Sequence, residues 1–302
     1  MATDPTAMVA ISLDAVIVAV SDGEPRLLVV GPDGAPPALP AGPLDVEADE
    51  TLELALRRWV SRQTRLDVGY VEQLYTFGDL GRRPDAGRTR QVSVAYLALV
   101  REAVPHLQAR FVDVYDLLPW EDHRQGEPPV LAEAVRPVLE RWAGDDRARR
   151  ERVASTFGPS WDGGRVLERY ELLYEAGAVA EAAVDADRPI PADVVGEAMR
   201  FDHRRMVATA LGRLRGKLTY RPLVFELLEE RFTLLELQRT VEALAGVRLH
   251  KQNFRRMIER SGLVEGTGER VAGQGGRPAE LFRSRPAAYG ERKRTGTAPP
   301  YR

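Results

Sequence analysis

The clearest hydrophobic pattern in the chain lies in a pair of amphipathic helices near the C-terminal end. Thr233 and Glu236 have the T-x-x-E spacing of a capping box, so they predict the start of the first helix. Gly246 predicts its end, because glycine adopts the left-handed conformation that closes many helices. The apolar positions of this helix share one face: Leu234, Leu237, Val241 and Leu244.

The second helix is predicted from Lys251 to Arg260, with Gly262 after it. Its inward face repeats at i, i+3, i+4 and i+7: Phe254, Met257, Ile258 and Ser261. Its opposite face is polar and largely basic: Gln252, Arg255, Arg256 and Glu259. Two such helices joined by a short glycine-containing turn are typical of a helix-turn-helix. The segment 263–265, the glycine-rich segment 273–278 and a short strand at 279–283 follow, and they predict the hairpin of a winged helix.

Two helices of an ordinary bundle would give the same pattern, and a charged outer face is usually only solvated. The distribution of charge favours the first interpretation. Residues 249–302 contain 12 Lys or Arg and 5 Asp or Glu, a net charge of +7, whereas the whole chain carries −2, so residues 1–248 carry −9. An acidic body with a basic end indicates that this end binds a polyanion.

Composition narrows the remaining possibilities. A length of 302 residues allows two domains with their own cores. The chain contains no cysteine, which excludes disulfides, zinc fingers and thiol catalysis, and its four histidines are too scattered to predict a metal cage. It shows neither a signal peptide nor an apolar run long enough to span a bilayer, so we expect a cytoplasmic protein with no membrane partner.

The first third of the chain has the alternating pattern of strands. Residues 8–20 and 26–30 predict a strand pair, and 91–100 and 111–115 predict further strands. A helix is predicted from Thr51, since five of six residues on one stripe are apolar: Leu52, Ala55, Leu56, Trp59, Val60 and Gln63. We expect Trp59 to lie in the core. This order of elements predicts an α/β sandwich.

The segments 39–42 and 50–58 resemble the loop and helix of the Nudix fold. In that family three helix glutamates hold magnesium against a diphosphate. Alignment on Glu50 and Arg58 places Trp59, Arg62 and Gln63 at the glutamate positions, and Gly42 falls two residues too early. One aromatic, one cation and one amide cannot form a magnesium site. The comparison therefore predicts no metal, no other cofactor and no catalytic residues.

Seven segments in the same order resemble the Nudix-related transcriptional regulators, the repressors of NAD metabolism: 75–79, 93–100, 201–205, 214–220, 232–238, 253–256 and 276–283. The resemblance covers about 8–118 and 200–285, and it implies an α/β Nudix-like sandwich with a C-terminal winged helix. We predict an effector-sensing domain at 8–118, a helical insertion at 119–199, a linker helix with the winged helix at 200–285, and a disordered basic tail at 286–302. Within the insertion, helices are expected at 130–142, 145–157, 166–183 and 192–199.

The resemblance implies a homodimer that places two recognition helices in successive major grooves of double-stranded operator DNA. Gln252 and Asn253 could contact adenine and Arg255 or Arg256 guanine or phosphate, although Asn253 could instead serve as a helix-start residue. We also predict DNA contacts from Lys251, from Arg277 in the wing and from Arg215 and Lys217.

The resemblance further implies a sensor whose inactive cleft binds ADP-ribose or a related nucleotide without cleaving it. The predicted effector contacts are Arg57, Arg58, Phe77, Asp79, Arg88 and Gln91. Two alternatives remain: the same architecture with a sugar or sugar phosphate as effector, and an active Nudix pyrophosphohydrolase with a DNA-binding appendage.

Overall fold

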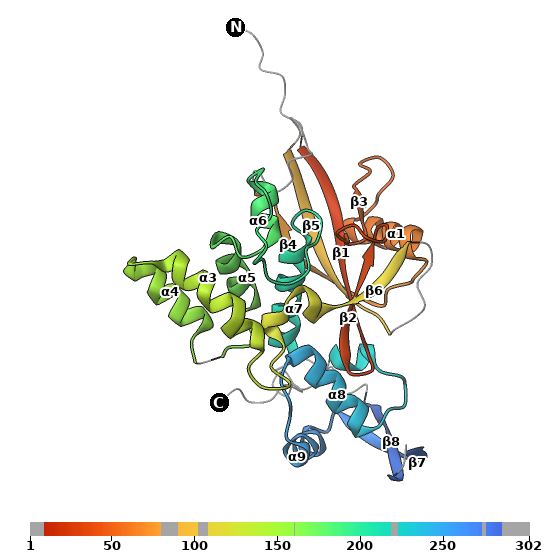
Figure 1. The fold of residues 1–302 in the computed structure, drawn as a ribbon. Coiled ribbons are helices and arrows are strands. Elements are labelled where there is room, and N and C mark those ends of the chain that lie inside the picture. Colours follow the sequence, from red (N-terminus) through yellow and green to blue (C-terminus); the bar gives the residue numbers. More distant parts are fainter. Residues whose placement is uncertain are drawn as a thin grey trace.

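A twisted six-stranded sheet forms the centre of the body (Figure 1). The computed structural model describes residues 9–79, 90–101, 108–159, 161–218, 223–273 and 276–285. The five long strands run in the order β4-β5-β1-β2-β6, and the short β3 pairs with β1. Their bounds are β1 Val9–Ser21, β2 Glu24–Val30, β3 Ala41–Pro43, β4 Tyr70–Phe77, β5 Arg90–Leu99 and β6 Ala109–Asp113. The predicted strands are therefore present, and β3 and β4 are additions to them.

Strand β1 organises the sheet because it is paired along both edges. It runs parallel to β5 from Val9↔Arg90 to Val18↔Leu99. It turns into β2 through Asp22 and Gly23, whose φ values of 52° and 79° are those of a tight primed turn. Because side chains alternate along a strand, the odd-numbered residues of β1 and the even-numbered ones face opposite layers.

Helix α1 (Leu52–Thr64) covers one face of the sheet, where it packs with Leu13, Ile17 and Tyr96. Thr51 caps its start by accepting from the backbone N–H of Leu54 at 3.1 Å. The opposite face is covered by the long helix α7 (His203–Leu218) and by helices of the middle region. The core on this face continues from the sheet into the C-terminal head, so sheet, middle region and head share one apolar interior.

The middle region, predicted as an insertion, contains mostly short helices. They are α2 (Val114–Leu117), η2 (Pro119–Glu121), the π turn η3 (Leu131–Val135), α3 (Arg136–Ala143), α4 (Arg147–Phe157), α5 (Val166–Glu175) and α6 (Ala180–Asp185). The single helix predicted at 166–183 is two helices, because Gly177 turns the chain with φ of 72°. The helix predicted at 192–199 was wrong. Gly196 has φ of 71°, and an added Cβ would lie 2.6 Å from the Leu117 carbonyl oxygen.

The C-terminal head has the predicted winged-helix architecture. It contains η4 (Leu223–Leu227), α8 (Leu234–Ala245), α9 (Lys251–Ser261), β7 (Val264–Gly273) and β8 (Gly276–Ser284). The capping box is confirmed, since Thr233 Oγ1 accepts from the Glu236 backbone at 3.2 Å and Glu236 accepts from the Thr233 backbone at 2.7 Å. Phe232 pairs with Phe282, which adds a bridge at the edge of the β7–β8 hairpin.

The predicted basic tail, 286–302, and the predicted effector contact Arg88 lie outside the described residues. Among the helices that are described, none combines the length and the apolar composition required to cross a bilayer.

Candidate nucleic-acid interface and sensor face

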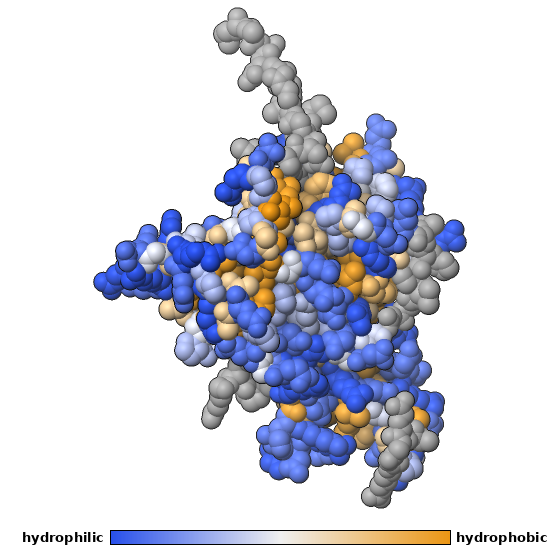
Figure 2. All heavy atoms as spheres, viewed as in Figure 1, coloured by the Kyte–Doolittle hydropathy of each residue, from blue (hydrophilic) through white to orange (hydrophobic). Residues whose placement is uncertain are grey.

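Helix α9 presents a polar outer face to solvent. Phe254 and Ile258 anchor it against the head, with 3% and 0% of their surfaces exposed. The outward positions are all exposed: Lys251, Gln252, Asn253, Arg255, Arg256, Glu259 and Arg260. Figure 2 shows that the visible surface over the head is mainly hydrophilic. His250 occupies the N-cap position, so Asn253 lies in the first turn of the helix. The structure therefore brings together the predicted α9 contacts on one accessible face.

The cations of this face differ from other cations of the head in their partners. Arg231 pairs with Glu269 at 2.6 Å, Arg248 with Glu242 at 3.0 Å and Arg283 with Glu265 at 2.6 Å. Within the described part of the chain, no carboxylate pairs with the cations along α9 and the adjoining wing strand: Lys251, Arg255, Arg256, Arg260 and Arg270. Positive charge without compensating carboxylates is what a phosphate backbone requires.

A groove of about 490 Å³ lies between α9, the start of α8 and the wing. Lys251, Arg255 and Arg270 line it, together with the carboxylates Glu259 and Glu280. Arg270, an exposed residue of β7, is absent from the predicted contacts. Side chains alternate along a strand, so the position of Arg270 in the predicted wing hairpin could have indicated it as a contact. Arg277 belongs to β8, but its side chain lies outside the described part of the structure.

Arg215 and Lys217 do not lie on this surface, so their prediction as phosphate contacts was wrong. Both are on α7, and they are 1% and 6% exposed. Arg215 Nη1 donates to Glu121 Oε2 at 2.5 Å, and Lys217 pairs with Glu72 and approaches the hydroxyl of Tyr70 at 3.3 Å. A phosphate could reach either cation only after these buried ion pairs were broken.

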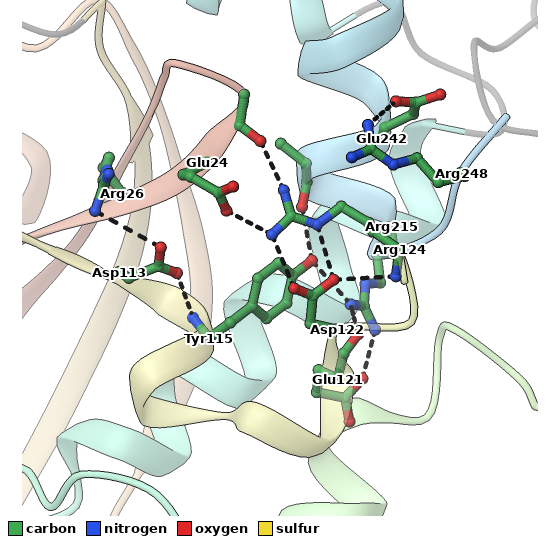
Figure 3. Close-up of polar contacts among 12 residues, drawn as sticks. Glu24, Arg26, Asp113, Tyr115, Glu121, Asp122, Arg124, Arg215, Glu242 and Arg248 are labelled. Atoms are coloured by element: carbon green, nitrogen blue, oxygen red, sulfur yellow. Dashed lines mark hydrogen bonds and ion pairs between the residues drawn. The ribbon is translucent and has the colours of Figure 1, made fainter. Parts of the chain in front are cut away.

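Arg215 belongs to a buried polar cluster that joins the body to the head (Figure 3). Glu121 lies at its centre and also accepts from Arg169 Nε at 2.6 Å. The other members of the cluster bind carbonyls at the end of α8. Tyr115 donates to the Ala243 carbonyl at 2.6 Å, Arg215 Nε to the Leu244 carbonyl at 3.0 Å, and the His123 backbone to the Gly246 carbonyl at 2.7 Å.

These contacts satisfy carbonyls that a helix end leaves without internal partners, so the body fixes the first helix of the helix-turn-helix. Burial raises the pKa of Tyr115 to about 12 and keeps the hydroxyl a donor across the physiological range. Burial also lowers the pKa of His123, and the nearby Glu121 carboxylate opposes part of that shift. The His123 ring stacks on Trp161 with a centroid separation of 3.9 Å.

In the degenerate Nudix box, two of the three residues at the glutamate positions, Trp59 and Gln63, hold β3. Trp59 Nε1 donates to the Pro43 carbonyl at 2.9 Å, and Gln63 exchanges two hydrogen bonds with the backbone of Ala41 at 2.8 and 3.0 Å. The Trp59 ring is partly buried and covers Gly42, where an added Cβ would lie 2.1 Å from it, so its expected place in the core was wrong.

The donor set here does not fit magnesium. Arg62 occupies one of the glutamate positions, and Arg58 and Arg62 flank the Trp59 ring at 5.5 and 5.6 Å, so two guanidinium groups lie beside the box. Among the described residues, no group of three or more metal-ligating side chains is gathered anywhere. A hard divalent cation requires oxygen ligands and is repelled by neighbouring positive charge.

The structure separates the predicted effector contacts into two groups. Arg57 and Arg58 belong to α1. Arg57 donates to the carbonyls of Val68 and Gly69, and Arg58 pairs with Asp49 at 2.8 Å. Arg57 therefore stabilises the turn after α1, whereas Nε of Arg58 is buried and has no hydrogen-bond partner among the residues that the structure describes.

The second group lies on the α7 face of the sheet. Phe77 packs in the core of that face, and Asp79 pairs with Arg205 of α7, whose guanidinium also lies 5.3 Å from the Phe77 ring. Ala95 and Leu97 of β5 lie in the core on this face. Because side chains alternate along a strand, Gln91, which also has an odd number, belongs to the same face.

The same part of the sheet contains buried polar residues that are absent from the predicted effector contacts. Ser12 and Ser93 are adjacent in the β1–β5 register, and both are 4% exposed. Asp14 lies two residues further along β1 and contacts His203 of α7. Polar residues at strand positions that should be apolar are the signal that could have identified this sensor face, which we define as Ser12, Asp14, Phe77, Asp79, Gln91, Ser93, His203 and Arg205.

These two features define the class of protein: a Nudix-like domain whose box is unsuited to a metal, joined to a winged-helix DNA-binding domain. The family model for the NrtR DNA-binding winged helix domain matches residues 224–284. A repressor of Acinetobacter baylyi described as ADPR responsive is 25% identical over 277 residues, 90% of this chain and 80% of its own length.

Solved structures show the same arrangement. NrtR of Shewanella oneidensis in complex with a 27mer DNA superposes with a TM-score of 0.56 and 24% identity, over 93% of this chain and 96% of its own. A MutT/nudix family protein from Enterococcus faecalis superposes with a TM-score of 0.56 and 16% identity, over 94% of this chain and 90% of its own. Residues 224–284 therefore form a winged helix of the NrtR type, and the whole chain has the arrangement of these relatives, a Nudix-like domain followed by a C-terminal winged helix.

Proposed function

We propose that this protein is a transcriptional repressor that binds operator DNA through α9 and the wing and is controlled by a nucleotide that binds the Nudix-like domain. The observation that carries the proposal is the exposed row of cations on α9 and β7 that have no carboxylate partner among the described residues, set on a winged helix that matches the NrtR domain model. The structure of the similar protein from Shewanella oneidensis was solved in complex with DNA, and the similar protein from Acinetobacter baylyi is a repressor.

In the proposed complex, α9 enters the major groove and the wing reaches an adjacent phosphate or minor groove. In this proposal, Gln252 and Asn253 contact bases. Arg255 and Arg256 bind guanine or phosphate, and Lys251, Arg270 and Arg277 bind the backbone. A homodimer would place two such heads one helical turn apart, which predicts an operator with twofold symmetry.

For the effector, we propose ADP-ribose or a nucleotide of the same class. The Acinetobacter relative responds to ADP-ribose, and here Arg62 stands at a glutamate position of the box, with Arg58 also beside the Trp59 ring. Guanidinium groups bind phosphate oxygens directly, so diphosphate binding would not require magnesium. Binding would release DNA if the nucleotide prefers the arrangement of heads that does not fit the operator.

A sugar or sugar phosphate is the alternative effector, because the carboxylates of the sensor face, Asp14 and Asp79, can also bind hydroxyl groups. Thermal unfolding with ADP-ribose, ribose 5-phosphate and free sugars separates these classes. A ligand at 100 times its Kd adds about 2.7 kcal/mol to the unfolding free energy. Turnover of ADP-ribose with magnesium would instead support the hydrolase alternative.

The DNA-binding proposal is tested by fluorescence anisotropy with the full chain and the DNA upstream of its own gene. We expect affinity to fall steeply with salt, with a log–log slope of about −0.9 per phosphate neutralised. Arg256→Ala should weaken binding, whereas Arg283→Ala, which alters an exposed but paired arginine of the same head, should not. Equal binding by wild type and Arg256→Ala would contradict the assignment of α9 as the recognition helix.

A further inference from the structure

Helix α7 makes buried polar contacts near both of its ends, and the two sets reach different parts of the protein. At the N-terminal end, His203 is 1% exposed and lies between β1 and the loop before β3. The backbone N–H of Leu39 donates to its Nδ1 at 2.9 Å, and its Nε2 lies 3.2 Å from Asp14 Oδ1. Since Nδ1 accepts a hydrogen bond, this arrangement assigns the ring proton to Nε2, which donates to Asp14.

Neighbouring residues fix the same end of α7 to the sensor face. The Arg200 backbone donates to the Pro37 carbonyl at 2.9 Å, and Arg205 pairs with Asp79. Between them, Phe201 has φ of 54°, a conformation that is unfavourable for an aromatic residue and persists only where surrounding contacts impose it. The entry to α7 is therefore held against the loop that leads to Gly42 and against the end of β4.

Near the C-terminal end of α7, Arg215 Nε donates to the Leu244 carbonyl in the last turn of α8. Its Nη1 binds Glu121, and Lys217 pairs with Glu72 of β4. Twelve residues separate His203 from Arg215, and a helix rise of 1.5 Å per residue gives a span of roughly 18 Å. A single continuous helix therefore connects the sensor face with the first helix of the DNA-binding head.

We infer that α7 carries the effector signal from the sensor face to the head, and that His203 is the positioning residue through which the loop at 39–42 controls this helix. The inference rests on the proposed function, since it concerns how the nucleotide changes DNA binding. A ligand that moves the loop displaces the Leu39 N–H, and with it the first turn of α7. Because α7 moves as a rigid body, the displacement reaches α8 at Leu244.

Two substitutions separate the hydrogen bonds of His203. Asn has its amide at the position of Nδ1, so His203→Asn can still accept from Leu39 while the contact with Asp14 is lost. Gln has its amide near the position of Nε2, so His203→Gln can still donate to Asp14 while the contact with Leu39 is lost. Each variant keeps one of the two hydrogen bonds and loses the other in the same buried site, so each controls for the destabilisation of the other.

Gln63→Ala is the matched control for the loop itself. Gln63 binds both backbone groups of Ala41, so its removal loosens the same loop from α1 without changing the link to α7. Its removal can change the affinity for the nucleotide. It should leave unchanged the ratio by which a saturating nucleotide alters DNA affinity.

The measurement is this coupling ratio, the operator Kd with saturating ADP-ribose divided by the Kd without it, using a duplex selected in vitro by the full chain. Calorimetry establishes that ADP-ribose binds each variant, and the thermal unfolding midpoint establishes that each is folded. We expect a coupling ratio in the range of about 5 to 150 in wild type. It should persist in His203→Asn and Gln63→Ala and fall to near one in His203→Gln.

A wild-type coupling ratio in His203→Gln overturns the inference. Loss of coupling in Gln63→Ala overturns it as well, because a loosened loop would then abolish coupling without any change at His203. Failure of the proposed function is distinguishable from both results: the wild-type chain would show no binding of ADP-ribose, or no change in DNA affinity, before any variant was compared.

Discussion

The cations of α9 and those of α7 look alike in the sequence but are placed in opposite environments. Arg255 and Arg256 are exposed and have no carboxylate partner among the described residues, whereas Arg215 and Lys217 are buried in ion pairs with Glu121 and Glu72. Arginines exposed without partners are suited to a mobile polyanion. Buried paired cations fix the position of one structural element against another. The first group is suited to binding DNA. In the second, Arg215 holds the end of α8 in the head, and Lys217 holds α7 against β4.

The largest effect is expected from removing Arg215. Arg215→Met leaves Glu121 with Arg169 as its remaining cationic partner and removes the donor to the Leu244 carbonyl. Breaking one side of a buried charge cluster costs about 3–5 kcal/mol in unfolding free energy. Urea denaturation followed by circular dichroism measures this loss. A loss below about 1 kcal/mol would mean that the cluster does not hold the head in solution.

Removal of Arg255 should have the opposite effect: stability is kept and DNA binding is weakened. Arg255→Ala should leave the unfolding free energy within about 0.5 kcal/mol of wild type, because the side chain is exposed and makes no ion pair within the described chain. It should weaken DNA binding by about 1–3 kcal/mol if the arginine contacts guanine. A phosphate contact would instead reduce the salt slope by about 1 and weaken all sequences alike. Unchanged DNA affinity would remove Arg255 from the interface.

Sequence and structure agree best where a pattern is local. The capping box at Thr233, the glycines that end both head helices and the apolar face of α9 depend on spacings of three or four residues, and all are present in the structure. The box residues could also be excluded as metal ligands from their side-chain types alone. The assignment of Arg215 failed for a different reason. Its partner Glu121 lies 94 positions away, and no local spacing indicates whether such a cation meets solvent or a carboxylate.

The sensor face shows the same limit. Phe77, Asp79 and Gln91 are together on the α7 side of the sheet, whereas Arg57 and Arg58 belong to α1 on the other side. The sheet topology, with β1 parallel to β5, decides which residues share a face. Ser12, Asp14 and Ser93 were visible as polar residues within apolar strands, and only the fold places Ser12 against Ser93 and Asp14 against His203.

A smaller effect is expected from the hydroxyl of Tyr115. Tyr115→Phe keeps the buried ring and removes the 2.6 Å hydrogen bond to the Ala243 carbonyl. Loss of one such bond costs about 1 kcal/mol, and up to about 3 kcal/mol if the carbonyl then has no partner. Hydrogen exchange should show faster opening at the end of α8 than in wild type. If exchange there is unchanged, the contacts of Arg215 and His123 suffice to hold the head.

The smallest predicted effect is a dependence of stability on pH that originates in the buried cluster and not in α9. Burial keeps the pKa of His123 below its ordinary value in the folded protein, so the unfolded chain takes up the proton first as the pH falls. Above about pH 6.5, the unfolded value, both states are neutral at this residue and its effect is absent. Below that pH the unfolding free energy should decrease until the folded protein is protonated as well. His123→Phe keeps a ring against Trp161 and removes the titrating group, so its unfolding free energy should decrease less between pH 7 and 5 than that of wild type. Parallel curves for the two proteins would show that His123 does not contribute to the pH dependence of stability.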